Sequence, residues 1–263
     1  MKVGFISDIH VSKYSNIPEI IKEIACEKEL DLIIIAGDIC DHYDDTRKII
    51  KRIVGGTQID LRFVSGNHDL YRQGGRSSLE AYNALLNNPY NLTSHPIIGE
   101  NFAIIGDTGW YDYSYNPNNY SVEKLKEKTY GHVKWLDKLY INWDDMDDAA
   151  ISDFFINRLN EQIDNHIGKE VTVVTHFVPF EEFVIYKEDP NWDYFSSFTG
   201  SEKYGELFVS KGVKTAVFGH THTRYHQTFK GIECICRPLG NKYELEGKDL
   251  YREISDAFFV KIF

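Results

Sequence analysis

Short apolar runs that end in polar residues recur along the chain, and this repeat constrains the fold more than any other feature. Six such runs have the length of a strand and are rich in Val, Ile or Phe. They cover 2–8, 31–38, 61–69, 102–109, 171–176 and 215–220. Apolar runs of this length, bounded by turn or polar residues, are typical of strands that are buried on both faces. The repeat therefore predicts a buried sheet core.

Segments of helical character lie between several of these strands. Apolar residues recur at near-helical spacing in 17–30, 44–54 and 77–86, and a longer amphipathic segment, 149–168, ends in a glycine. Helix 77–86 opens with serine, a preferred N-cap residue. Because strands and helices alternate, we expect a layered α/β fold. No repeat or Gly/Ser linker divides the chain, so we expect a single domain over 1–263.

Two aromatic-rich stretches, 110–148 and 177–200, interrupt the alternation and are expected to be insertions. Two interpretations remain open for them. They form a lid over the ends of the strands, or they form an ordinary packed subdomain, since loops carry functional contacts but also pack on themselves.

Polar side chains gather where the predicted strands end. Ligands of open α/β sheets bind at the carboxyl ends of the strands, so we expect these exits to share one rim. The residues concerned are Asp8, His10, Asp38, Asn67, His68, His176, His220 and His222. Successive side chains alternate in an extended chain, so His220 and His222 are expected to point the same way.

Seven of these residues form a ligand set for divalent transition metals. Imidazole nitrogen and carboxylate oxygen suit Mn, Fe, Zn or Ni, and two ions about 3.5–4 Å apart can clamp a phosphate. The set comprises Asp8, His10, Asp38, Asn67, His176, His220 and His222. Four histidines, two aspartates and one amide at strand exits are not typical of packing alone.

Five ordered motifs resemble those of the calcineurin-like metallophosphoesterases. They are D-x-H (Asp8, His10), G-D-x-x-D (Gly37, Asp38, Asp41), G-N-H-D (66–69), Thr-His (His176) and G-H-x-H (Gly219, His220, His222). The resemblance implies a four-layer αββα sandwich with a dinuclear metal centre that activates a hydroxide to hydrolyse a phosphoester. One ion would be held by Asp8, His10, Asp38 and His222, and the other by Asp38, Asn67, His176 and His220. Asp38 would then bridge the two ions.

The resemblance also implies roles in catalysis. His68 would face the substrate, as a general acid for the leaving oxygen or as a stabiliser of the transition state, and Asn67 would contact the substrate beside it. Asp41 would orient His68, with a turn carboxylate as the alternative. His42 follows Asp41 at the position where phosphoprotein phosphatases of this superfamily carry a phosphate-binding arginine, so we expect it to touch the substrate.

The motifs narrow the substrate only in part. Intact G-N-H-D and G-H-x-H are similar to those of cyclic-nucleotide phosphodiesterases and of broad bacterial phosphodiesterases, and GWYDYS (109–114) resembles a segment of a bacterial phosphoesterase group. We therefore expect a small phosphoester substrate, a diester rather than a monoester. The alternatives are a nuclease or cyclic-nucleotide phosphodiesterase of the same superfamily, and a non-catalytic metal-binding scaffold.

Composition limits the partners and the location. A formal net charge of -11 disfavours a dedicated nucleic-acid binder, although nucleic acid stays open as a partner. The four cysteines form no C-x-x-C pair, so we expect reduced, mostly buried thiols. The chain opens directly on a predicted strand and no apolar stretch reaches about 18 residues, so we expect a cytoplasmic protein without a membrane segment.

Overall fold

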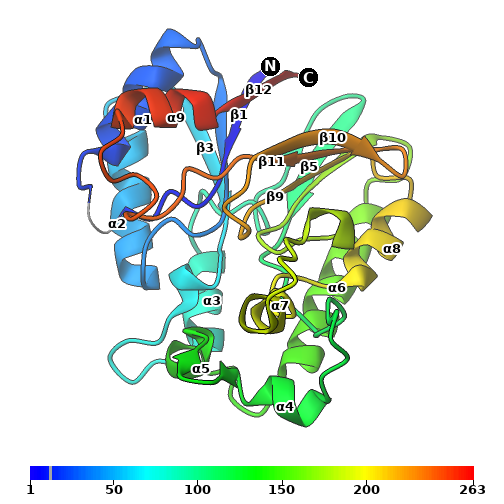
Figure 1. Cartoon of the computed structure of the whole chain (residues 1–263). Helices are drawn as coiled ribbons and strands as arrows, with labels where there is room; N and C mark the ends of the chain where they lie inside the picture. The colour runs from blue at the N-terminus through cyan, green and yellow to red at the C-terminus, as the bar shows by residue number, and fades with distance from the viewer. Residues whose placement is uncertain (12–13) are drawn as a thin grey trace.

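The computed structural model describes residues 1–11 and 14–263, and two sheets packed face to face form its centre (Figure 1). The first sheet has the order β12-β1-β2-β3. Its strands β1 (Lys2–Ile6), β2 (Leu32–Ala36) and β3 (Asp60–Val64) are parallel, and β12 (Phe259–Ile262) pairs antiparallel with β1. The carboxyl ends of β1, β2 and β3 therefore lie at the same edge.

The second sheet has the order β10-β11-β9-β8-β5-β4. Its central strands are parallel to one another: β11 (Ile232–Cys236), β9 (Thr215–Phe218), β8 (Glu170–Val174) and β5 (Phe102–Gly106). The edge strands β10 (Tyr225–Phe229) and β4 (Ile97–Ile98) run antiparallel. This sheet also presents the carboxyl ends of its parallel strands at one edge.

Helices cover the outer faces of both sheets (Figure 1). Helices α1 (Ile17–Glu27), α2 (Tyr43–Val54) and α9 (Leu250–Ala257) lie together on the first sheet, and α3 (Ser78–Leu86) contacts α2. Helices α6 (Asp148–Asp164) and α8 (Glu202–Ser210) lie on the second sheet. The predicted layered α/β fold is confirmed.

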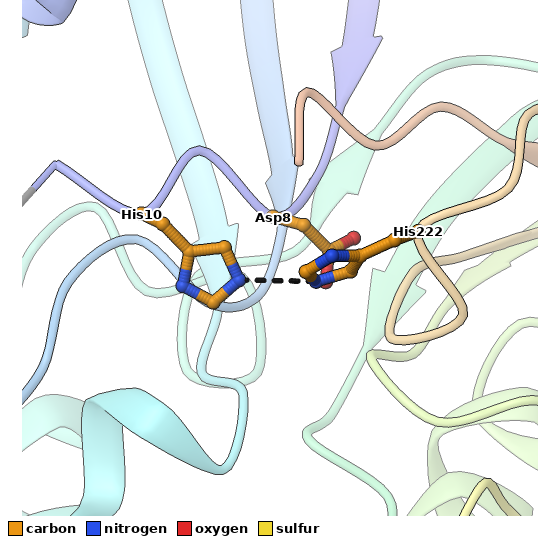
Figure 2. A group of neighbouring side chains, drawn as sticks. All are labelled: Asp8, His10 and His222. Atoms are coloured by element: carbon orange, nitrogen blue, oxygen red, sulfur yellow. Dashed lines mark hydrogen bonds and ion pairs between the residues drawn. The ribbon is translucent and has the colours of Figure 1, made fainter. Parts of the chain in front are cut away.

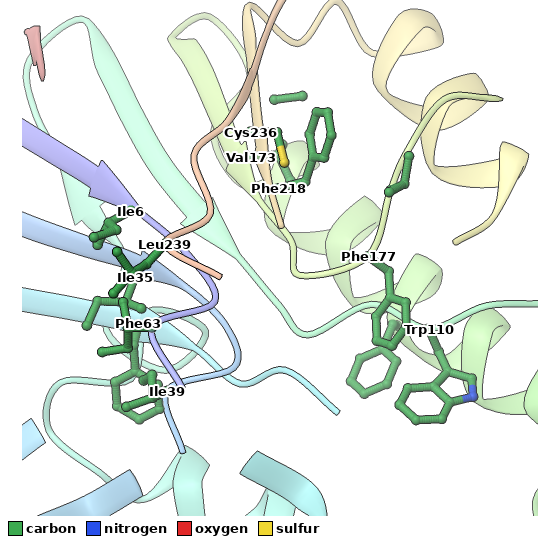
Figure 3. Close-up of a cluster of buried hydrophobic side chains, with 14 of the residues drawn as sticks. Ile6, Ile35, Ile39, Phe63, Trp110, Val173, Phe177, Phe218, Cys236 and Leu239 are labelled. Atoms are coloured by element: carbon green, nitrogen blue, oxygen red, sulfur yellow. The ribbon is translucent and has the colours of Figure 1, made fainter. Parts of the chain in front are cut away.

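Alternation along the strands divides the core into layers. Val3 and Phe5 of β1 pack between the sheets, together with Ile34 of β2 and Val217 of β9. The intervening side chains, such as Ile33, belong to the cluster that faces the helices. Figure 3 draws part of that cluster, including Ile6, Ile35 and Phe63 from the first sheet and Val173, Phe218 and Cys236 from the second. A strand with both faces buried reads as a continuous apolar run, which explains the sequence pattern.

Each predicted strand is present, but it ends before the polar residues that close its run. The third run, 61–69, ends as a strand at Val64, and a short 3-10 turn, η1 (His68–Leu70), follows. The serine predicted to cap helix 77–86 does so: Ser77 Oγ accepts a hydrogen bond from the Glu80 amide, and the Glu80 carboxylate accepts one from the Ser77 amide. The ligands therefore lie on loops and not on the strands themselves.

The two aromatic-rich insertions pack against each other. The first contains α4 (Val122–Lys126), β6 (Thr129–Tyr130), β7 (Val133–Lys134) and α5 (Asp137–Tyr140), and the second contains η2 (Glu181–Phe183) and α7 (Pro190–Ser196). Trp110 is fully buried and its ring lies 4.8 Å from that of Tyr111 and 4.9 Å from that of Phe177. Figure 3 shows Trp110 and Phe177 side by side. The insertions thus have an aromatic core of their own.

Two smaller expectations can be compared with the structure. All four cysteines are free, and Cys40, Cys234 and Cys236 are buried, as expected, whereas Cys26 is exposed. Within the described residues, no helix has both the length and the apolar character needed to cross a membrane.

Candidate metal centre

Loops that follow five parallel strands bring the predicted ligands together in two groups. Within each group the ligand atoms lie within 4.8 Å of one another. The first group contains Asp8 and His10, from the loop after β1, and His222, from the loop after β9 (Figure 2). The second contains Asp38, His176 and His220. The structure therefore places the sequence-predicted histidines and aspartates at one edge of the two sheets.

Short distances between donor atoms define each group. In the first, His222 Nε2 lies 3.2 Å from His10 Nε2 and 3.5 Å from Asp8 Oδ1. In the second, His176 Nε2 lies 3.1 Å from His220 Nδ1 and 3.2 Å from Asn67 Oδ1. The seven predicted ligands are thus all part of this arrangement.

Asp38 joins the two groups. Its Oδ2 atom lies 3.7 Å from His10 Nε2 in the first group and 3.4 Å from His176 Nε2 in the second. One buried carboxylate therefore faces both, which is the position that a bridging ligand requires.

Burial and neighbouring charges set the protonation of the predicted ligands. Although burial raises the pKa of Asp8, the His222 hydrogen bond and the charge of His176 outweigh it and lower that pKa to about 2. Burial lowers the pKa of His10 to about 4 and that of His220 to about 3, so both imidazoles are neutral. Burial also disfavours the charged forms of His176 and His222, but the charge of Asp38 raises the pKa of His176 to about 9, and the hydrogen bonds to Asp8 and Glu244 raise that of His222 to about 10. A cation bound at these two rings would therefore replace a proton. Buried ionised carboxylates beside nitrogen lone pairs are the donor set that divalent transition metals prefer, so these residues fit such ions.

The remaining ring nitrogens are held by hydrogen bonds. His176 Nδ1 lies 3.0 Å from the Ala36 carbonyl, His220 Nε2 lies 3.2 Å from the Phe198 carbonyl, and His222 Nδ1 lies 2.7 Å from Glu244 Oε2. Each of these nitrogens can donate to its oxygen, which leaves the other nitrogen of the ring for a metal. Such outer contacts fix the tautomer and the orientation of ligating histidines.

The backbone of the ligand loops is unusual. Five of the seven predicted ligands have positive φ: Asp8 (51°), His10 (38°), Asp38 (52°), His220 (70°) and His222 (53°). A left-handed conformation costs a residue with a side chain on the order of 1 kcal/mol or more, and such residues cluster at functional sites. This strain points to a conformation held for function.

The expectation for His220 and His222 was wrong in its geometry. Strand β9 ends at Phe218, and both histidines have positive φ, so the segment turns and is not extended. The turn sends His220 to one group and His222 to the other. Simple alternation would have placed both rings on the same side.

Three glycines allow the ligands to approach the backbone closely. A Cβ atom on Gly66 would lie 2.1 Å from Asp38 Oδ1, and one on Gly219 would lie 2.5 Å from Asp8 Oδ2. A Cβ atom on Gly37, whose φ is +84°, would lie 2.5 Å from His176 Nδ1. Real Cβ atoms do not approach other atoms this closely, so any side chain here would displace a ligand.

His68 and Asp41 form a hydrogen-bonded pair beside the second group. His68 Nδ1 lies 2.7 Å from Asp41 Oδ1, and His68 Nε2 lies 3.9 Å from Asp38 Oδ2. Burial lowers the pKa of His68, but the charges of Asp38 and Asp41 and the Asp41 hydrogen bond outweigh it and raise that pKa. The ligand atoms of His10, Asp38 and His68 also lie within 4.8 Å of one another. His68 therefore has the geometry of an acid held by a carboxylate, and also that of a ligand.

His42 is held by a backbone contact. Its Nδ1 atom lies 3.0 Å from the Tyr71 carbonyl, and its amide donates to the His68 carbonyl. These contacts connect the loop after β2 with the turn at His68. The expected contact between His42 and substrate stays a prediction.

Three acidic residues without an assigned role support the ligands. Asp69 accepts hydrogen bonds from the Ile39, Cys40 and Gly66 amides, which ties the two ligand loops together. Glu244 accepts from His222, and Asp137 accepts from Asn67 Nδ2 at 2.8 Å. Asp69 stands within a motif, whereas Asp137 begins the short helix α5 and Glu244 lies in a turn, and neither position carries a sequence signal.

Asp137 is expected to set the affinity of the second group for its metal. Its Oδ2 atom accepts from Tyr111 and Trp135, so both of its oxygens are used. In Asp137→Asn, an amide NH₂ replaces one of the two carboxylate oxygens and faces the hydrogen-bond donors of Asn67 or of Tyr111 and Trp135. The side chain of Asn67 is then no longer held in place. We expect Mn²⁺ affinity at one of two sites to fall about 10–100-fold, measured by calorimetric titration.

The matched control is Asp145→Asn, an exposed carboxylate of the same insertion. It is expected to bind both ions as the wild type does. Two unchanged sites in Asp137→Asn, in a folded protein, would contradict the role assigned to Asp137.

A cavity of about 630 Å³ opens beside the two groups. Its floor includes Asp38, Asn67, His68, His220 and His222. Its walls come from both insertions and from the loop at 241–244. Both interpretations of the insertions therefore hold in part, since they pack on themselves and also line the cavity.

A layered α/β fold whose strand ends gather carboxylates and imidazoles in this way defines a metal-dependent hydrolase. The family model of the calcineurin-like phosphoesterases matches residues 1–224. The chain belongs to this family and is a phosphoester-hydrolysing enzyme, which confirms the resemblance seen in the motifs.

Solved structures share the fold. Phosphopantetheinyl hydrolase from Mycobacterium tuberculosis is 18% identical, with a TM-score of 0.77 over 95% of this chain and 94% of that chain. A dimetal phosphatase from Danio rerio is 14% identical, with a TM-score of 0.57 over 90% of this chain and 86% of that chain. No functionally curated protein matches the chain. At these identities the likeness concerns the fold.

Proposed function

We propose that this enzyme hydrolyses a small phosphodiester with two divalent ions held by the seven predicted ligands. The observation that carries the proposal is the position of Asp38, whose carboxylate faces both histidine groups. Asp8, His10 and His222 would complete one site, and Asn67, His176 and His220 the other. Two ions bound there would supply charge that activates water and stabilises the transferred phosphoryl group.

The side chains around these groups have separable tasks. Asn67 and His68 line the cavity floor and are placed to contact the phosphate. With Nδ1 held by Asp41, the Nε2 atom of His68 would donate a proton to the leaving oxygen. Asp41 therefore acts through His68 and is a positioning residue in this mechanism.

The charge of the cavity favours a diester. Among the described residues that line it, Lys134 is the one Lys or Arg side chain. A phosphate monoester carries up to two negative charges near neutral pH, whereas a diester carries one. Beyond the two proposed ions, the described lining offers a second negative charge on the phosphate only Lys134 and His68, so the cavity suits the singly charged substrate better.

A pair of chromogenic substrates tests the proposal. With Mn²⁺ bound, bis(4-nitrophenyl) phosphate is expected to show a kcat/KM at least about tenfold above that of 4-nitrophenyl phosphate, a difference of about 1.4 kcal/mol in barrier. Preference for the monoester would overturn the diester assignment. A protein that binds two ions and hydrolyses neither compound would overturn the enzyme mechanism itself and favour the scaffold alternative.

Several finer expectations stay predictions. The ligand set suits Mn, Fe, Zn and Ni alike, so the identity of the ions needs metal analysis of the isolated protein. A cytoplasmic location and the exclusion of nucleic-acid substrates are likewise expectations. Cyclic nucleotides and single-stranded DNA belong in the same substrate assay, because the superfamily alternatives differ from the proposal only in the substrate.

A further inference from the structure

Large apolar side chains are exposed at the mouth of the cavity beside the metal centre. Val133 is 54% exposed, Leu136 47%, Trp192 43% and Tyr243 72%, and all four line the cavity. Single exposed apolar side chains are ordinary, but a group of them at one cavity mouth marks a binding surface. We name Val133, Leu136, Trp192, Phe195 and Tyr243 the apolar wall.

The indole donors beside and within this wall are already used. Trp192 Nε1 donates to the Ile185 carbonyl at 2.7 Å, and Trp135 Nε1 donates to Asp137 Oδ2 at 2.9 Å. The two indoles therefore offer a ligand ring surface and no hydrogen-bond donor. Lys187 Nζ lies 3.3 Å from the centre of the Trp192 ring, a cation–π contact that helps to hold the ring in place.

The apolar wall is continuous with the metal centre. The ring of Trp135 lies 5.9 Å from that of Phe195 and 6.0 Å from that of His220, a member of the second group. A molecule whose phosphate lies on the cavity floor would thus extend its ester group along the wall. A volume of about 630 Å³ is within the range of small-molecule sites and exceeds the needs of a phosphate alone.

We propose that the apolar wall binds an uncharged alkyl or aryl group esterified to the phosphate of the substrate. This inference rests on the proposed function, because it requires the phosphate of the same molecule at the metal groups. The scarcity of cations in the cavity argues against a substrate with further phosphates. The wall thereby distinguishes among diesters by the size of their apolar ester group.

Two diesters with the same leaving group test the wall by kinetics. Phenyl 4-nitrophenyl phosphate and methyl 4-nitrophenyl phosphate both release 4-nitrophenolate and differ only in the retained ester group. We expect the wild type to prefer the phenyl ester about tenfold in kcat/KM, mainly through KM. Trp192→Ala and Tyr243→Ala should each reduce that preference to less than about threefold, because the loss in kcat/KM is larger for the phenyl ester than for the methyl ester.

Binding of compounds that cannot be hydrolysed tests the affinity of the apolar wall separately from catalysis. Diphenylphosphinate and dimethylphosphinate are anions that cannot be hydrolysed, and calorimetry on the Mn²⁺-loaded protein should show about tenfold tighter binding of the diphenyl compound. This advantage should fall in Trp192→Ala and Tyr243→Ala. Ile167→Ala, which removes an exposed apolar side chain absent from the cavity lining, is the control and should match the wild type.

The outcomes distinguish a failure of the proposed apolar binding from a failure of the proposed hydrolysis. The binding role of the apolar wall is contradicted if the wild type hydrolyses the two diesters equally, or if both wall variants keep the preference for the phenyl ester. Either result leaves the proposed phosphodiester hydrolysis intact. Absence of hydrolysis with two ions bound overturns the proposed function, and the phosphinate affinities then decide whether the wall binds apolar groups.

Discussion

Asp38→Asn is expected to lower hydrolysis of bis(4-nitrophenyl) phosphate at least about a thousandfold, or about 4 kcal/mol in barrier. It should also lower the bound metal from two ions per chain to one or none. The reason is that Asp38 Oδ2 lies beside both His10 and His176, so the variant removes one anionic oxygen from two sites at once. Metal analysis after dialysis and steady-state kinetics measure the two effects.

Asp45→Asn is the matched control for that experiment. Asp45 is a surface carboxylate of α2 whose oxygen pairs with Lys48, and its loss is expected to leave metal content and activity unchanged. Two ions retained by Asp38→Asn, with activity near that of the wild type, would show that the groups do not share a carboxylate. The assignment of a bridged centre would then be wrong.

His68→Ala is expected to lower kcat more for a substrate with a basic leaving group than for one with a weakly basic leaving group. A general acid contributes about 10²–10⁴-fold where the leaving oxygen needs a proton. We therefore expect a loss of about 10²–10³ in kcat for diphenyl phosphate and a loss of about tenfold for bis(4-nitrophenyl) phosphate, whose leaving group needs little assistance. Metal content should stay at two ions per chain.

Metal analysis of the same variant separates the two roles that the geometry allows for His68. Loss of an ion in His68→Ala would show that His68 acts as a ligand in the group that it forms with His10 and Asp38. Equal losses on both substrates would also exclude proton donation. Either result would contradict the assignment of His68 as the acid.

Asp41→Asn tests the same pair by its pH dependence. The Asp41 charge and hydrogen bond raise the pKa of His68, so their loss should lower that pKa. An acid with a lower pKa loses its proton at lower pH. The alkaline limb of the kcat profile for diphenyl phosphate should therefore move to lower pH in Asp41→Asn, whereas a mere turn carboxylate would leave the profile in place.

The parts of the site that could be predicted are those set by the sheet. Asp8 and Asp38 follow adjacent parallel strands of the first sheet, which end at a common edge, so sequence order alone places these two together. His176 follows β8 of the second sheet, so its approach also depends on how the two sheets pack. The same reasoning succeeded for Asn67, which follows β3. Local pattern and a general rule of topology were sufficient there.

The supporting residues could not be predicted in this way. Asp137 reaches Asn67 across 70 residues of sequence, and Glu244 reaches His222 from an irregular loop. Neither contact has a periodicity, because each depends on how an insertion or loop packs against the finished sheets. Strand β10 was missed for a related reason, since its edge position leaves YHQTF largely exposed and polar.

The left-handed backbone conformation of five predicted ligands lowers the stability of the folded chain. The left-handed conformations of Asp8, His10, Asp38, His220 and His222, which disfavour side chains, raise the free energy of the folded state. Cation binding at the proposed sites would offset this cost by a free energy that grows with the logarithm of the ion concentration relative to the dissociation constant. The supply of metal would thus set the fraction of the chain that is folded, as well as the rate at which it works.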